Sequence, residues 1–157
     1  PTRQNSVQSF SQWCKSKHTL PQETKHTVRV LLQKAGTTDC NRAERKLSKR
    51  RILDLSSHKI SDLSPLAQLT NLTELYLSYN KISDLSPLAR LTKLKFLFLE
   101  SNQIKDLSPP SPLNHLTWLF VGGNPIENET CPVEPESVCE FDMEADEILP
   151  EDLGIFA

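Results

Sequence analysis

A repeat of 22 residues restricts the possible folds of this chain more than any other feature. The pattern L-x-x-L-x-L-x-x-N-x-I occurs at residues 72–82, 94–104 and 116–126, and a weaker copy precedes them at 50–60. The ninth position of the pattern recurs at a constant step of 22, at His58, Asn80, Asn102 and Asn124. Short units that cannot bury their apolar side alone stack on their neighbours, so this step predicts a solenoid.

The leucines at the fourth and sixth positions of the pattern predict one short β-strand in each copy. Alternate residues of a strand face opposite sides, so these leucines point into the core and the residues between them face a concave, open surface. The amide at the ninth position follows the strand, where it can donate to and accept from the backbone of neighbouring coils. We therefore expect a ladder of Asn80, Asn102 and Asn124, with the ring nitrogens of His58 replacing the amide at the edge coil.

The segments after the first two strands predict short helical turns on the convex side. Ser64-Pro65 and Ser86-Pro87 supply the residue types that begin a helix. The third copy differs, because residues 108–112 contain three prolines and Pro110 stands where a leucine is expected. We expect this convex segment to be extended.

The residues before the repeats, 1–48, predict a helical cap. Between Pro21 and Gly36, apolar residues three and four apart share one helix face, namely Val28, Leu31, Leu32 and Ala35. A second helix should begin at Asp39 and reach Leu47. Such helices can cover the apolar edge of the first coil. We assign residues 49–126 to about four repeats and residues 127–157 to a C-terminal cap with an acidic tail.

The four cysteines lie in two pairs, Cys14 with Cys40 before the repeats and Cys131 with Cys139 after them. Of the three formally possible pairings, only the local one would staple each end, so we predict these two disulfides. Four free thiols are the alternative, but an even count confined to the two caps favours an oxidising compartment. We therefore expect an exported protein, secreted or periplasmic, whose leader is absent from this chain.

A zinc site is another conceivable use of the first cysteine pair, because His18 and His26 lie between Cys14 and Cys40. Their spacing, C-x3-H-x7-H-x13-C, matches none of the usual zinc arrangements. A disulfide is the simpler interpretation. We expect no metal and no cofactor.

Charge is distributed unevenly along the chain although the net charge is only −2. Residues 1–51 contain twelve Lys or Arg against three acids, whereas residues 127–157 contain eleven acids and no Lys or Arg. The basic segment lacks the interleaved aromatic residues that stack on bases, so we expect no nucleic acid as a partner. No stretch is apolar for long enough to cross a bilayer, and we expect no membrane insertion.

The repeats resemble the internalin-like, 22-residue class of leucine-rich repeats over residues 47–126. The flanking segments 10–14, 26–36 and 131–139 resemble those of secreted leucine-rich-repeat proteins of cyanobacteria. The resemblance implies an α/β solenoid, a short leucine-rich-repeat horseshoe with a parallel concave sheet. It would carry a helical N-terminal cap and a disulfide-stapled C-terminal cap. The resemblance also implies protein recognition on the concave face, without assigning that role to particular residues.

Aromatic residues are concentrated on the predicted concave face. The third position of the pattern reads Ile52, Glu74, Phe96 and Trp118, and the fifth reads Asp54, Tyr76, Phe98 and Phe120. Adjacent strands lie about 4.8 Å apart, so these side chains should form two columns. Aromatic residues also suit strands for structural reasons alone, but an exposed cluster of rings is a patch that monomers usually cover with a partner. We predict Tyr76, Phe96, Phe98, Trp118 and Phe120 as anchors, with Glu74, Asp54 and Glu100 as the polar rim.

The sequence contains no P-loop, nucleophile elbow or glycine-rich phosphate loop. Asp54, Glu74 and Glu100 could pair as acid and base, but a shallow, wet surface does not separate their pKa values. We therefore predict a non-enzymatic module that binds a protein or peptide. Two alternatives stay open at this point. One is a structural or self-associating protein whose acidic, apolar tail covers the patch or the basic cap of a neighbour, and the other is carbohydrate binding on an aromatic platform.

Overall fold

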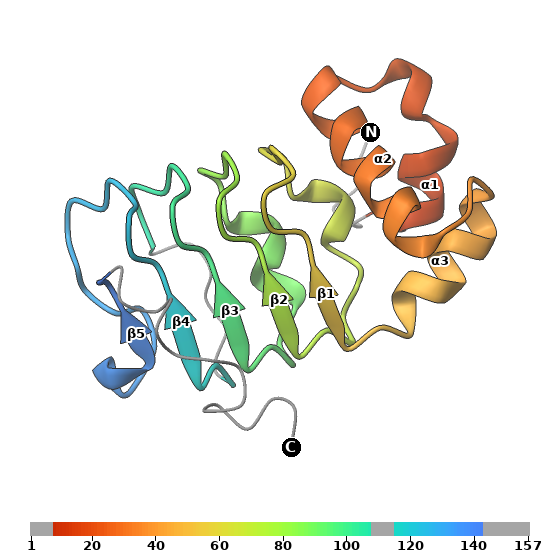
Figure 1. Cartoon of the computed structure of the whole chain (residues 1–157). Helices are drawn as coiled ribbons and strands as arrows, with labels where there is room; N and C mark the ends of the chain where they lie inside the picture. The colour runs from red at the N-terminus through yellow and green to blue at the C-terminus, as the bar shows by residue number, and fades with distance from the viewer. Residues whose placement is uncertain (1–7, 108–114, 143–157) are drawn as a thin grey trace, which may run out of the picture.

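The computed structural model describes residues 8–107 and 115–142. Figure 1 shows a group of helices at the N-terminal end of a row of parallel strands, and after β1 and β2 the chain returns behind the sheet. The described part contains one five-stranded sheet in the order β1-β2-β3-β4-β5. Neighbours in the sheet are thus neighbours in sequence, as a solenoid requires. The predicted fold class is confirmed.

The N-terminal cap consists of α1 Phe10–Lys15, η1 Lys17–Thr19, α2 Gln22–Ala35 and α3 Cys40–Ser48, where η denotes a 3-10 helix. Gly36 ends α2 with a φ of 72°, a left-handed conformation that glycine adopts readily. Asp39 begins α3, and its Oδ1 accepts a hydrogen bond from Arg42 N at 3.0 Å. This bond lowers the pKa of the Asp39 carboxyl. Both predicted helices are confirmed.

Helix α1 was not predicted from the sequence. It begins at Ser9, whose Oγ accepts from Gln12 N at 3.2 Å, while Gln12 Oε1 accepts from Ser9 N at 2.8 Å. This reciprocal pair is a capping box, and the pattern S-x-x-Q ahead of an apolar residue is the signal that could have identified the helix. Phe10, the first residue of α1, is fully buried.

Side-chain hydrogen bonds attach α2 to the first coil. Thr24 Oγ1 donates to Asp62 Oδ2 at 2.5 Å, and Thr27 Oγ1 donates to the Asp62 carbonyl at 2.6 Å. His26 Nε2 donates to the His58 carbonyl at 2.6 Å. Because the first coil has no coil before it, these bonds occupy backbone and side-chain acceptors that would otherwise lack a partner from the solenoid.

The strands are β1 Ile52–Asp54, β2 Glu74–Tyr76, β3 Phe96–Phe98, β4 Trp118–Phe120 and β5 Cys139–Glu140. In the first four, the central leucine of each strand pairs with that of the next, as Leu53 with Leu75 and Leu97 with Leu119. The side chains of these four central leucines are at most 2% exposed. The four strands predicted from the repeats are therefore confirmed, and the leucines form the core.

The fifth strand was not predicted. Cys139 pairs with Leu119 and Glu140 with Phe120, so the step to β5 is 20 residues instead of 22. The segment also lacks the paired leucines that identify the other strands. Cys139 forms a disulfide with Cys131, and this bond closes the loop that leads into the last strand.

The convex side contains the two helical turns expected from the Ser-Pro pairs. They are η2 Ser64–Leu66 and η3 Ser86–Arg90, each with proline in its first turn. Leu66 and Leu88 of these turns are fully buried, so the turns cover the core from behind the sheet. The extended segment predicted at 108–112 lies outside the described residues.

The asparagine ladder is present with the predicted hydrogen bonds. Asn80 Oδ1 accepts from His58 N at 3.0 Å and from Ile60 N at 2.9 Å, and its Nδ2 donates to the Leu55 carbonyl at 3.0 Å. All three partners belong to the preceding coil. Asn102 and Asn124 repeat this arrangement one and two coils further on. Each amide therefore binds the coil before its own.

His58 replaces the amide only in part. Its Nδ1 donates to the Ser56 carbonyl at 2.7 Å, the bond that corresponds to Asn80 Nδ2 with the Ser78 carbonyl at 3.4 Å. A preceding coil does not exist for His58, so the other ladder bonds have no counterpart there.

We predict that Asn102→Ala lowers the free energy of unfolding by about 1–3 kcal/mol, because it leaves buried backbone groups of two coils without partners. His58→Asn should be neutral or mildly stabilising, since an amide can also donate to the Ser56 carbonyl. Urea midpoints of the two variants and the wild type measure both effects. A His58→Asn variant that unfolds much earlier than the wild type would contradict the edge-coil interpretation.

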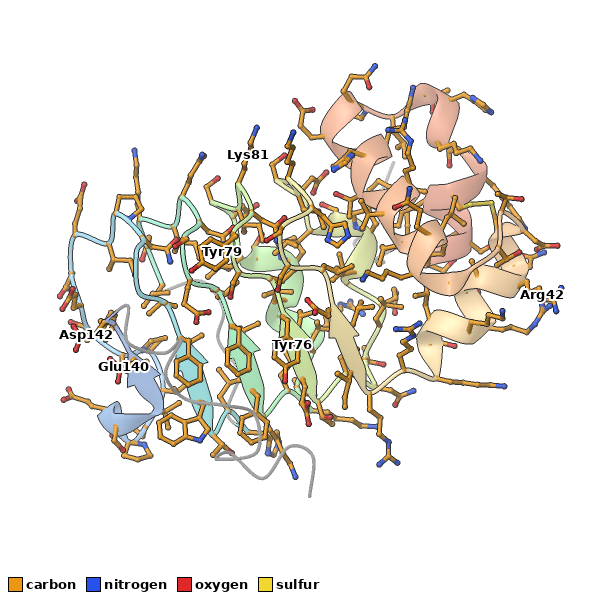
Figure 2. The ribbon with its side chains drawn as sticks, viewed as in Figure 1. Arg42, Tyr76, Tyr79, Lys81, Glu140 and Asp142 are labelled. Atoms are coloured by element: carbon orange, nitrogen blue, oxygen red, sulfur yellow. A yellow bond between two sulfur atoms is a disulfide. The ribbon has the colours of Figure 1, made fainter. Side chains whose placement is uncertain are left out.

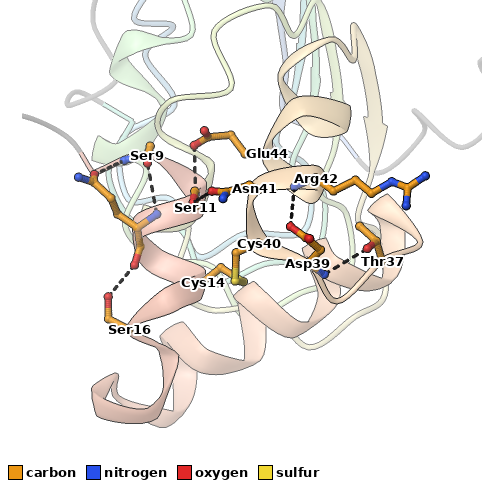
Figure 3. Close-up of a disulfide and its surroundings, with 11 residues drawn as sticks. Ser9, Ser11, Cys14, Ser16, Thr37, Asp39, Cys40, Asn41, Arg42 and Glu44 are labelled. Carbon is orange, nitrogen blue, oxygen red and sulfur yellow. Dashed lines mark hydrogen bonds between the residues drawn. A yellow bond between two sulfur atoms is a disulfide. The ribbon is translucent and has the colours of Figure 1, made fainter.

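Both predicted disulfides are confirmed. Cys14 and Cys40 have Cα atoms 5.6 Å apart, and Cys131 and Cys139 have Cα atoms 5.7 Å apart. Figure 3 shows the first bond joining α1 to α3, beside hydrogen bonds from Ser11 to Glu44 and Asn41. Since both cysteines form a disulfide, they cannot also hold zinc with His18 and His26.

Candidate partner-binding surface

The aromatic side chains of the sheet form a second cluster, separate from the leucine core. Its buried members are Phe98 and Phe120, and Tyr76, Phe96 and Trp118 pack against them. These residues alternate with the core leucines of β2, β3 and β4, so they lie on the opposite face of the sheet. Figure 2 shows the rings side by side across these strands, with Tyr76 at one end.

The rings of the fifth pattern position stack face to face across the strands. Tyr76 and Phe98 have centroids 4.6 Å apart and an interplanar angle of 8°, and Phe98 and Phe120 follow at 4.7 Å and 11°. Trp118 stacks on Phe120 within the same strand at 5.8 Å and 15°. The strand register brings all five predicted anchor residues together in one cluster.

We expected all five rings to be exposed, and this is wrong for two of them. Phe98 is 9% exposed and Phe120 has no exposed surface, whereas Tyr76, Phe96 and Trp118 are half-buried. Stacking explains the difference for Phe98, because each of its faces lies against another ring. Tyr76, Phe96 and Trp118 are therefore the rings that a partner can reach.

The predicted polar rim also needs correction. Asp54 is exposed, but Glu74 is 8% exposed and Glu100 only 4%. Glu100 Oε1 accepts a hydrogen bond from Ser78 Oγ at 2.5 Å. Ser78 and Glu100, which both occupy the seventh position of their copies, thus form a buried polar pair just after β2 and β3. Glu100 is therefore not part of an exposed rim.

Burial of Glu74 raises the pKa of its carboxyl, although the Tyr76 hydroxyl, which donates to Glu74 Oε2 at 3.5 Å, acts in the opposite direction. The pKa of Tyr76 is raised to about 12, first by burial and then by the charges of Glu74 and Asp54. The phenol thus lies in a negative potential.

Tyr79, three residues after Tyr76, was not among the predicted site residues. It is 48% exposed and lies above the rings of the sheet in Figure 2. Its φ is 60°, and the matching positions of the other coils, Ser57, Ser101 and Gly123, have the same left-handed backbone. A bulky residue rarely adopts this conformation, so an exposed tyrosine at this position suggests a role in binding.

The described residues offer no site for a metal and no membrane span. Within 8–107 and 115–142, His, Cys, Asp and Glu side chains do not gather in any group of three that could hold a metal ion. In the same part of the chain, none of the helices combines the length and the apolar character needed to cross a bilayer.

The register of 22 residues, the parallel sheet and the asparagine ladder define a leucine-rich-repeat fold. In agreement, residues 51–90 match the family model described as leucine-rich repeats in two copies. The leucine-rich repeats predicted from the sequence are therefore confirmed. The resemblance of the flanking segments to cyanobacterial proteins stays a prediction.

Two of the similar solved structures are internalins from Listeria monocytogenes. One (inlF) is 43% identical over 45% of this chain and 21% of its own length, with a TM-score of 0.43. Internalin C2 (inlC2) is 32% identical over 62% of this chain and 52% of its own length, with a TM-score of 0.45.

A third similar structure is a leucine-rich-repeat protein of Leptospira interrogans, 24% identical over 62% of this chain and 32% of its own length, with a TM-score of 0.40. The chain therefore spans between about a fifth and a half of the length of these proteins. No curated protein sequence matches the chain.

Proposed function

We propose that this protein is a non-enzymatic recognition module that binds a protein or peptide on the concave face of its sheet. The observation that carries the proposal is the aromatic cluster, which lies on the face opposite the leucine core. The core is complete without these rings, so their concentration on the open face supports a binding role. Leucine-rich-repeat proteins as a class bind proteins, which agrees with this proposal.

The accessible part of the surface is formed by Tyr76, Phe96 and Trp118, with Asp54 at one end. Half-buried rings backed by the fully buried Phe120 are rigid, so a partner that binds them loses little side-chain entropy in this protein. Such a surface favours apolar contacts in the centre and polar contacts at its edge.

Carbohydrate binding has less support from the geometry. Sugar rings stack on the free faces of exposed aromatic side chains, whereas stacking covers both faces of Phe98 and one face each of Tyr76 and Phe120. The cluster therefore lacks a broad open platform of the kind that sugars use.

A selection of random dodecapeptides on the immobilised protein tests the proposal. We expect the enriched peptides to bind the wild-type protein and to bind the double variant Phe96→Ser/Trp118→Ser at least about 30-fold more weakly, because the loss of even one anchor costs about 2 kcal/mol or more at an interface. Gln103→Ser, an exposed substitution outside the strands, is the matched control. Peptides that bind the double variant as well as the wild type would contradict the proposal.

Self-association is the second candidate, and the distribution of charge supports it. Residues 127–142 contain six acids and no Lys or Arg, whereas the helical cap at the other end is strongly basic. Copies could therefore associate end to end, with the acidic end of one beside the basic cap of the next. Light scattering at low and high salt distinguishes this candidate, because such an assembly should dissociate as salt screens the charges.

We also propose that the protein acts in an oxidising compartment, secreted or periplasmic. The two disulfides, which close the two ends of the described solenoid, support this location.

A further inference from the structure

One row of residues across the sheet combines rings with charge. The strand register places Asp54, Tyr76, Phe98, Phe120 and Glu140 beside one another, one from each strand. The row therefore reads acid, ring, ring, ring, acid. An apolar docking surface does not require this order, because carboxylates at the two ends of a ring stack add nothing to apolar contact.

The order matters because the inner ring faces are already occupied. Phe98 has Tyr76 against one face and Phe120 against the other. The outer face of Tyr76 is directed toward the strand of Asp54, and the outer face of Phe120 toward the strand of Glu140. A carboxylate beside a ring face is an arrangement that stabilises a cation twice, through the charge and through the ring quadrupole.

The two ends of the row differ in access. Phe120 is fully buried, and Glu140 is half-buried with its Oε1 accepting from Asp142 N at 3.0 Å. At the other end, Asp54 is exposed and Tyr76 is half-buried. Only the end at β1 is therefore open to a ligand from solution.

The open end is held in place and is negative. Asp54 Oδ1 accepts from Ser56 N at 3.0 Å, which holds the carboxylate at the end of its own strand, β1. Glu74 adds a second carboxyl within hydrogen-bond reach of Tyr76, and both acids act on the pKa of the phenol. The strands β1 and β2 contain no Lys or Arg that could neutralise these charges.

We propose that the outer face of Tyr76 and the carboxylate of Asp54 form a subsite for a cationic side chain of the partner, an arginine guanidinium or a lysine ammonium. The inference rests on the proposed function, because it specifies the chemistry of one part of the peptide or protein bound there. A planar guanidinium suits the subsite better than an ammonium, since it can stack on the ring and donate to the carboxylate at the same time. Ile52, 40% exposed on the neighbouring strand, offers apolar surface to the aliphatic stem.

Titration of the full chain with N-acetyl-arginine amide, followed by NMR of the Tyr76 ring, tests the subsite. N-acetyl-citrulline amide is the matched probe, because it has nearly the same shape without the charge. We expect the arginine probe to shift the Tyr76 ring signals and the citrulline probe to leave them unchanged. Asp54→Asn should weaken binding of the arginine probe by about three- to tenfold.

Asp84→Asn is the control, because Asp84 is also an exposed aspartate whose Oδ1 accepts from a backbone N–H two residues on, that of Ser86 at 2.9 Å. It should bind the probe like the wild type. Equal shifts with the two probes, no shift with either, or equal weakening by Asp84→Asn and Asp54→Asn would overturn the subsite.

The peptide selection separates this inference from the proposed function. Selected peptides that need Phe96 and Trp118, are rich in arginine or lysine and bind Asp54→Asn more weakly support both. Peptides that need the same two rings but contain no excess of basic residues and bind Asp54→Asn normally leave the recognition surface intact and overturn the cation subsite alone.

Discussion

Leu97→Ala is expected to lower the free energy of unfolding by about 2–5 kcal/mol, because it removes a side chain that is only 1% exposed from the centre of the core. Leu97 pairs with Leu75 and Leu119 on the flanking strands, so the cavity would lie between three coils. The solenoid has few ways to collapse around it, since each strand is held at both sides by its neighbours. Thermal or urea unfolding measures the effect.

Phe96→Ser is the matched control, one residue away on the other face of the same strand. Phe96 is half-buried and belongs to the aromatic cluster, so we expect a loss below about 1 kcal/mol while binding of selected peptides weakens. A large loss of stability for Leu97→Ala, with a small loss of stability but weaker peptide binding for Phe96→Ser, would show that one face of β3 forms the core and the other the binding surface. Equal destabilisation by both substitutions would mean that the rings serve the fold, and the recognition proposal would give way to a structural one.

Replacing both Cys14 and Cys40 by serine should lower the free energy of unfolding by about 3 kcal/mol, because the bond closes a long loop in the unfolded chain. The two cysteines are 26 residues apart, and they tie α1 to α3. Urea unfolding of the oxidised protein and of the double variant measures the loss.

The same change at Cys131 and Cys139, 8 residues apart, should have a smaller effect, because the loop is shorter. It should nevertheless loosen β5, whose first residue is Cys139. Hydrogen exchange of Val121 N, which donates to the Glu140 carbonyl at 2.9 Å, is a local measure of that strand. Unchanged exchange after removal of the bond would show that β5 is held by its pairing alone.

The repeats could be predicted from the sequence because one physical rule acts on every copy. A strand with leucines at alternate positions and an amide after it has one stable way to stack, so the register of Leu53, Leu75, Leu97 and Leu119 follows from the spacing. The two elements that were missed, α1 and β5, lie where this rule no longer applies. α1 depends on a local capping box at Ser9, and β5 on a step of 20 residues.

The sequence predicted which residues form the candidate site, but it did not predict which of their side chains are exposed. Pattern positions show which face a residue occupies, and this placed Tyr76, Phe96 and Trp118 correctly on the open face. They do not show how closely side chains on that face pack against one another. Phe98 and Phe120 became buried by ring stacking and further packing, and Glu100 by its bond to Ser78, and such contacts depend on side-chain geometry.

Because of the asparagine ladder, removing coils from the C-terminal end of the repeats and removing them from the N-terminal end have different costs. Asn102 donates to the Leu77 carbonyl and accepts from Ile82 N, both in the coil before its own. A chain that stopped short of Asn102 would thus lose this coil and all later ones, and would also leave the Leu77 carbonyl and Ile82 N of the last surviving coil without their Asn102 partner. Removing a coil from the other end breaks sheet bonds to the next coil, such as that from Thr73 N to the Arg51 carbonyl, but in the ladder it leaves only side-chain atoms of Asn80 without partners. The ladder consequently adds a larger cost to a premature stop codon in the repeats than to a deletion of equal length at their start.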